Sequence, residues 1–149
     1  MLKYGIKIGW VLAVGFISPA LAADFVSTKV AGVVLYDAPD LHSQKRFVLG
    51  VNYPLERITQ DKTWFKVRDG AGALAWIEQK NTQNQPHMLQ VIVPKAAIHQ
   101  AADDASPVVF YAGQNVLLQA VEPARLGWVK VRHQDGSVGY MAIKQVWGL

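Results

Sequence analysis

The stretch that decides the fold is Trp64-Phe65-Lys66-Val67-Arg68, because the chain repeats it as Trp128-Val129-Lys130-Val131-Arg132. Side chains in both stretches alternate with the two-residue period of a β-strand. One face carries only apolar residues, so we expect it to line a core, and the Trp and its two cations then face outward. Twelve residues after each Trp stands a second aromatic, Trp76 or Tyr140. This doubling predicts two copies of one small β-unit.

Composition limits the classes of function. The chain has 149 residues, enough for one domain or two of about sixty, and its 51% hydrophobic and 17% charged residues indicate a folded protein. The net charge of +4 includes Lys3 and Lys7; without them thirteen basic residues face eleven acidic ones, and +2 does not indicate a nucleic-acid partner. The absence of cysteine excludes disulfides, thiolate metal sites and a cysteine nucleophile.

Residues 1–22 are expected to form a signal peptide. Lys3 and Lys7 precede a short apolar run, residues 8–17, and Ala20-Leu21-Ala22 offers small residues for cleavage after about Ala22. The alternative is a transmembrane anchor, but about ten apolar residues are too few to cross roughly 30 Å of hydrocarbon. We therefore expect a periplasmic or secreted protein without a stable membrane anchor.

The remaining chain is expected to divide into a first repeat at residues 23–80, a linker at 81–87 and a second repeat at 88–149. Residues 81–86 contain no large apolar side chain and are rich in amides, which is typical of a boundary. In the first repeat, short β-rich stretches at 30–36, 47–49, 53–58, 64–68 and 74–77 are separated by turn residues. Asp69-Gly70 predicts a hairpin turn, because this pair tolerates the positive φ that tight hairpins require.

The two repeats align by counting. Residues 35–50 match residues 98–113 at a constant offset of 63, and residues 64–77 match 128–141 at an offset of 64. One additional residue near Leu126 accounts for the change. The pattern therefore predicts an all-β chain of two tandem units.

The order of these motifs resembles that of bacterial Src-homology-3 domains, and more narrowly that of exported tandem proteins of this type. The resemblance is carried by Leu35-Tyr36-Asp37-Ala38-Pro39, the Trp-x-Lys-Val-Arg strand, a Gly turn, and the small-aromatic-aliphatic triplets at 75–77 and 139–141. It implies two small Src-homology-3-like β-barrels in tandem, five strands in each, with an aromatic ligand groove and binding of cell wall or peptide.

The resemblance places candidate binding residues in the first repeat: Tyr36, Tyr53, Trp64, Arg68 and Trp76. Three interpretations remain open for these rings. They form a ligand groove, Trp64 and Trp76 form a stabilising cross-strand pair, or the two repeats cover each other's aromatic faces. In the second repeat His99 stands where Tyr36 does and Tyr140 replaces Trp76, so we expect that repeat to be structural.

The outward cations have two readings, contact with an anionic polymer or an ordinary solvated face. They are Lys66, Arg68, Lys130 and Arg132. The four His residues lack the spacings of a metal site, and no carboxylate pair or nucleophile motif indicates catalysis. We expect no cofactor, no metal and no enzymatic activity.

Two functions follow. The first is a non-enzymatic periplasmic binding module that recognises peptidoglycan or an extended peptide through the first repeat. The alternative is a structural or assembly protein whose repeats pack on each other and on a protein partner without a small ligand.

Overall fold

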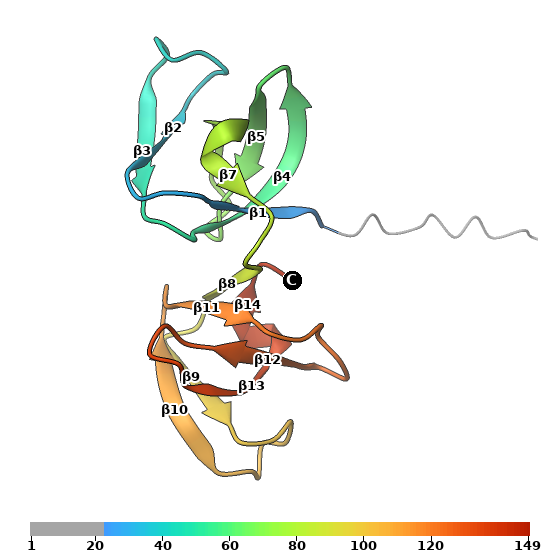
Figure 1. The fold of residues 1–149 in the computed structure, drawn as a ribbon. Coiled ribbons are helices and arrows are strands. Elements are labelled where there is room, and N and C mark those ends of the chain that lie inside the picture. The colour runs from blue at the N-terminus through green and yellow to red at the C-terminus, as the bar shows by residue number, and fades with distance from the viewer. Residues whose placement is uncertain (1–22) are drawn as a thin grey trace, which may run out of the picture.

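The computed structural model describes residues 23–149, and the expected signal peptide lies outside them. Figure 1 shows two lobes, with the segment after β7 running from one to the other. Apart from two single-turn 3₁₀ helices, all regular elements of residues 23–149 are strands. The prediction of an all-β chain is therefore confirmed. Within these residues, no helix has the length and apolar character needed to cross a membrane.

Each repeat is one antiparallel seven-stranded sheet, and the strand order is the same in both. The first runs β3-β2-β6-β5-β4-β1-β7 and the second β10-β9-β13-β12-β11-β8-β14. In the first repeat the elements are β1 (Phe25–Thr28), β2 (Val33–Tyr36), β3 (Lys45–Leu49), β4 (Pro54–Asp61), β5 (Trp64–Arg68), β6 (Leu74–Glu78), η1 (Gln79–Asn81) and β7 (Thr82–Gln83). In the second they are β8 (Met88–Val91), β9 (Lys95–His99), β10 (Val108–Gly113), β11 (Leu117–Ala120), β12 (Trp128–Arg132), β13 (Val138–Ala142), η2 (Ile143–Gln145) and β14 (Val146–Trp147).

The sequence predicts five strands in the first repeat, and the structure adds β1 and β7. β1 pairs with β4 on one side and with β7 on the other. β7 is only two polar residues long, so it carries no alternating pattern, and it falls inside the segment expected to be the linker. Long-range pairing with β1, not local sequence, makes these residues a strand.

The two repeated strands bury the face that the alternation predicts. Phe65 and Val67 of β5 join the first core, and Val129 and Val131 of β12 join the second. Both cores are apolar and each belongs to one repeat. The fully buried side chains that dominate them include Leu35, Leu55, Ile77, Leu89, Ile98, Leu118 and Met141.

The hairpin turn after β5 forms as expected, but a different residue takes the positive φ. Gly72 has a φ of +88°, and its counterpart Gly136 has +91°. Asp69 holds the turn through its carboxylate, which accepts hydrogen bonds from the backbone N–H groups of Ala71 (3.0 Å) and Ala73 (2.8 Å). The turn geometry therefore does not explain why residue 70 is a glycine. The contact between the repeats does.

Gly70 lies against the second repeat. A Cβ atom at this position would lie 2.4 Å from Oε1 of Gln90 and 3.4 Å from the Trp147 ring. The Gln90 amide also donates a hydrogen bond to the Tyr53 hydroxyl (3.3 Å). Phe25 and Trp147 pack edge to face, with ring centroids 5.0 Å apart. The two repeats are thus in direct contact through side chains of β1, β8 and β14.

Candidate functional site

Three of the five predicted binding residues come together in the first repeat. Tyr36 and Trp64 pack edge to face, with ring centroids 5.5 Å apart and planes at 90°. Trp76 lies opposite Tyr36 across the β2–β6 pair and opposite Lys66 across the β5–β6 pair. The Lys66 ammonium stands 6.0 Å from the centroid of the Trp76 ring. We call Tyr36, Trp64 and Trp76 the first aromatic cluster.

The expectation that Trp64 is an open outward ring is wrong. Its side chain and that of Tyr36 are each only 9% exposed, although neither belongs to the first core. The two rings cover each other, because edge-to-face packing gives large aromatic side chains a favourable contact outside the core. Trp76 is half-buried and is the most exposed residue of the three.

The other two readings predict a directly opposed pair of Trp residues or an interface between the repeats. Trp64 lies opposite Glu78, not Trp76, so the two Trp residues are not a direct cross-strand pair. The contact between the repeats is made by Phe25, Gly70 and their partners in β8 and β14, not by the first aromatic cluster. Tyr36 is therefore what covers Trp64.

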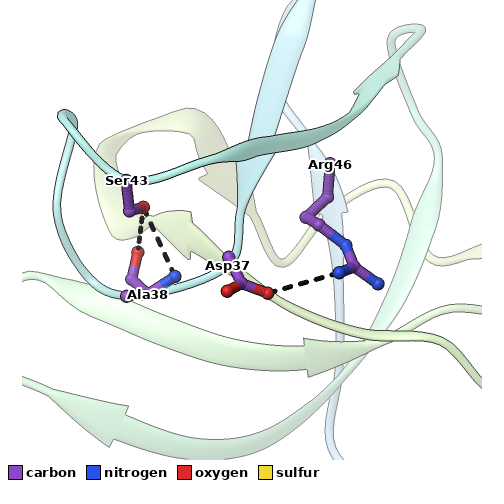
Figure 2. Close-up of polar contacts among 4 residues, drawn as sticks. All are labelled: Asp37, Ala38, Ser43 and Arg46. Carbon is purple, nitrogen blue, oxygen red and sulfur yellow. Dashed lines mark hydrogen bonds and ion pairs between the residues drawn. The ribbon is translucent and has the colours of Figure 1, made fainter.

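The β2–β3 loop beside Tyr36 is held by short polar contacts (Figure 2). The Ser43 hydroxyl accepts a hydrogen bond from the Ala38 N–H (3.3 Å) and lies within donating distance of the Ala38 carbonyl (3.1 Å). Arg46 forms an ion pair with Asp37 at 3.3 Å. In the second repeat Ser106 accepts from the Ala101 N–H at 3.0 Å, so both copies fix this loop in the same way.

Tyr53 and Arg68 lie apart from the first aromatic cluster. Arg68 ends β5 opposite Glu56, whereas Trp64 begins β5 opposite Asp61, so the two stand at opposite ends of the strand pair. Arg68 is held by Glu56, whose carboxylate accepts from its Nε (2.7 Å) and lies 2.6 Å from Nη2. Tyr53 comes directly before β4, at the Arg68 end, and contacts Gln90. The structure does not bring these two side chains to the three rings.

The second repeat contains a matching cluster. His99 replaces Tyr36 and packs edge to face on Trp128, with centroids 5.7 Å apart. Tyr140 lies opposite His99, and the Lys130 ammonium stands 5.6 Å from the Tyr140 ring centroid. The His99 ring is fixed by a 2.8 Å contact between Nδ1 and the Ser106 carbonyl, which requires a proton on Nδ1. We call His99, Trp128 and Tyr140 the second aromatic cluster.

A pocket of about 320 Å³ opens beside the second aromatic cluster, lined by Trp128, Tyr140, Lys130 and residues of the β11–β12 loop. Pro123, Arg125 and Leu126 form its loop wall, and Leu126 is 89% exposed. The sequence did not predict this pocket, because the replacements at 99 and 140 depart from the pattern of the first repeat and favour a structural role for the second. The additional residue near Leu126 was the available signal, because it marks a loop that differs from the tight β4–β5 turn.

This second-repeat pocket is lined by two cations, Lys130 and Arg125, and one carboxylate, Glu122. Lys130 forms an ion pair with Glu122 at 2.7 Å, and this hydrogen bond raises the pKa of Lys130 above its ordinary value. A larger pocket of about 460 Å³ lies beyond Glu122 and Pro123, between His87 and Leu149. It contains no Trp, Tyr or Phe ring. Among residues 23–149, no group of three His, Cys, Asp or Glu side chains is arranged to hold a metal ion.

Comparison with known proteins identifies the fold family. The family model described as bacterial SH3 domain matches residues 29–84 and again residues 93–148. No curated protein matches the chain significantly.

Two solved structures from Trichomonas vaginalis are similar to the chain at low identity. NlpC2 is 16% identical with a TM-score of 0.38 over 86% of this chain and 49% of its own. NlpC1 is 17% identical with a TM-score of 0.39 over 91% and 50%. The chain spans about half the length of each, and TM-scores below 0.5 add nothing to the family assignment. The two family matches cover most of the chain, which therefore belongs to the bacterial SH3 domain family and carries two such domains in tandem.

Proposed function

We propose that this protein is a non-enzymatic binding module of the cell envelope, exported by its N-terminal segment, that recognises peptidoglycan or an extended peptide. The observation that carries the proposal is the aromatic cluster built twice at the same place in the sheet, each with a half-buried ring beside a lysine. Rings that lie outside both cores and keep accessible surface are suited to stacking on a ligand.

The ligand surface differs between the repeats. In the first repeat Trp76 supplies the more exposed ring, on the strand beside the packed Tyr36–Trp64 pair. In the second repeat Tyr140 and Trp128 line a pocket of about 320 Å³, whose volume is at the lower end of the range for ligand sites. The proposal therefore extends to both repeats, and the second is no longer only structural.

The alternative function also has support. The repeats pack on each other through Phe25, Trp147 and Gln90, as an assembly protein would require. These contacts involve no residue of either aromatic cluster, so they are compatible with binding and do not replace it.

Binding to purified peptidoglycan sacculi tests the proposal. Trp76→Ala and Tyr140→Ala each remove a half-buried ring that is not part of either core, so the fold should survive. The pair should weaken sacculus binding at least about tenfold, because aromatic anchors are worth more than about 1 kcal/mol each. Trp64→Ala is a poor probe, since it removes a ring that is 9% exposed and supports the sheet.

Val48→Ala is the matched control, because Val48 is 69% exposed on β3 and belongs to neither cluster. It should bind sacculi as the unmodified chain does. If the Trp76 and Tyr140 variants, shown to be folded by circular dichroism, retain full binding, the aromatic clusters are not the recognition surface.

A further inference from the structure

One cation differs between the two repeats although the strand sequence around it is the same. Arg68 ends β5 and is paired with Glu56 through Nε and Nη2. Arg132 ends β12 in the same way, but the residue opposite it is Gln119. Among residues 23–149, Arg132 has no acidic partner within ion-pair distance. The second repeat therefore presents a guanidinium whose donors are free for a ligand.

Arg132 lines a pocket between the two repeats. Its volume is about 320 Å³, and its walls combine Val51 and Asn52 of the first repeat, Pro86 of the connection, and residues of β8, β11 and the β12–β13 turn. Its lining also includes Met88 of β8 and Leu117 of β11. An unpaired guanidinium thus lines a small hollow of mixed apolar and polar character that neither repeat would form alone.

No carboxylate lines this pocket. The acidic group nearest in sequence, Asp135, is already engaged: it accepts the Ser137 N–H at 2.8 Å and lies 3.1 Å from Nδ1 of His133. The backbone hydrogen bond from Ser137 lowers the pKa of Asp135, and its carboxylate lies beside His133 and not within ion-pair distance of Arg132. Gln119, Gln134 and Asn52 add neutral amides around the single unpaired cation.

We propose that this inter-repeat pocket binds the carboxylate of a short peptide, with Arg132 as the anion-binding residue. A guanidinium presents paired N–H donors in the geometry that a carboxylate accepts in a bidentate manner. One unpaired cation matches a single negative charge, and the walls formed by Val51, Pro86, Met88 and Leu117 suit short aliphatic side chains. The proposal does not depend on the aromatic clusters, because none of their residues lines this pocket.

Titration with N-acetyl-Ala-Ala tests the assignment, and N-acetyl-Ala-Ala-amide serves as the matched ligand without the charge. Binding is followed by NMR on the full mature chain, through the Arg132 side-chain Nε–H signal and the backbone signals of Asn52 and Met88. The free acid should shift all three signals together, and added salt should weaken its binding. The amide should bind at least about tenfold more weakly, because hydrogen bonds to charged groups are the strong ones.

Gln119→Glu is the decisive variant. It recreates the Glu56–Arg68 pair of the first repeat, so it neutralises Arg132 without removing a side chain, and the first repeat shows that the strand pair accepts it. Affinity for the free acid should fall at least about tenfold. Arg132→Gln should do the same, and Arg68→Gln, which removes an already paired cation, should leave affinity unchanged.

Equal binding of acid and amide, no binding within peptide solubility, or unchanged affinity in a folded Gln119→Glu chain would each overturn the proposal. The sacculus experiment tests the aromatic clusters and the dipeptide titration tests the Arg132 pocket, so either proposal can be refuted without the other. Loss of sacculus binding in the Trp76 and Tyr140 variants with intact dipeptide binding would assign the two ligands to two separate sites.

Discussion

Gly70→Ala should weaken the contact between the two repeats without disturbing the turn in which it lies. The hairpin does not require glycine there, since Gln134 occupies the same position of the second-repeat turn and the positive φ falls at Gly72 and Gly136. Glycine is needed at position 70 because the Gln90 side chain of the second repeat lies against it. The added Cβ would lie 2.4 Å from Oε1 of Gln90, a separation that requires Gln90 to move.

The expected loss of stability can be estimated from the hydrogen bonds that Gln90 makes. Its amide nitrogen donates to the Tyr53 hydroxyl at 3.3 Å and to Oδ1 of Asn115 at 3.0 Å, and its side chain is 5% exposed. Displacing it costs those two hydrogen bonds, about 0.5–1.5 kcal/mol each. A Gly to Ala change at a permissive backbone position gains about 0.4–1 kcal/mol. The net loss should be about 1 kcal/mol, or roughly 2–4 °C in melting temperature for a chain of this size.

Thermal unfolding and the NMR signals of Trp147 and Asn115 measure the effect. Gly50→Ala is the control, because nothing lies within 4 Å of the added Cβ, so it should only gain about 0.4–1 kcal/mol of stability. Gln90→Ser introduces the residue found at the matching position of the first repeat, Ser27 in β1. It removes the side chain that would clash with the added Cβ at position 70. In that background Gly70→Ala should no longer destabilise. A destabilisation that persists, or none in the single variant, would refute the reasoning.

Two further predictions concern the second repeat. Gly139→Ala should destabilise it by about 1–3 kcal/mol in chemical denaturation, because the added Cβ would lie 2.7 Å from the His99 carbonyl and 2.5 Å from Cγ2 of Ile98. Asp135 has a pKa below its ordinary value through the hydrogen bond from Ser137. Its contribution to stability is therefore present above the unfolded-state pKa and is lost as pH falls through the lowered folded-state value. Asp135→Asn should make unfolding less sensitive to acid, and an unchanged acid dependence would contradict this.

The fold could be predicted from sequence because its determinants are local. Alternation in the repeated strand identifies the buried face, and Phe65, Val67 and their counterparts lie in the two cores as expected. The constant offset places equivalent residues in equivalent strands, so both sheets have one strand order. β7 could not be predicted, since two polar residues become a strand only through their pairing with β1.

The candidate site was predictable only in part. Sequence placed Tyr36, Trp64 and Trp76 on one surface, and the sheet register brings them together. It could not show that Tyr36 would cover Trp64, because edge-to-face packing depends on the loop after β2. Nor could it separate Tyr53 and Arg68 from the rings, since that depends on which end of the β4–β5 pair each occupies.

The contact between the repeats is heterologous, because each repeat contributes a different surface to it. Comparison of the two copies shows why it is not reciprocal. Gly70 of the first repeat meets Gln90 and Trp147 of the second. The matching positions are Gln134, Ser27 and Gln83, so a reciprocal contact would have neither the glycine nor the Gln90 and Trp147 side chains that form this one. A head-to-tail contact between like units can propagate into an open assembly. Because all three contacting residues are replaced at the matching positions, we expect this contact to be limited to one pair.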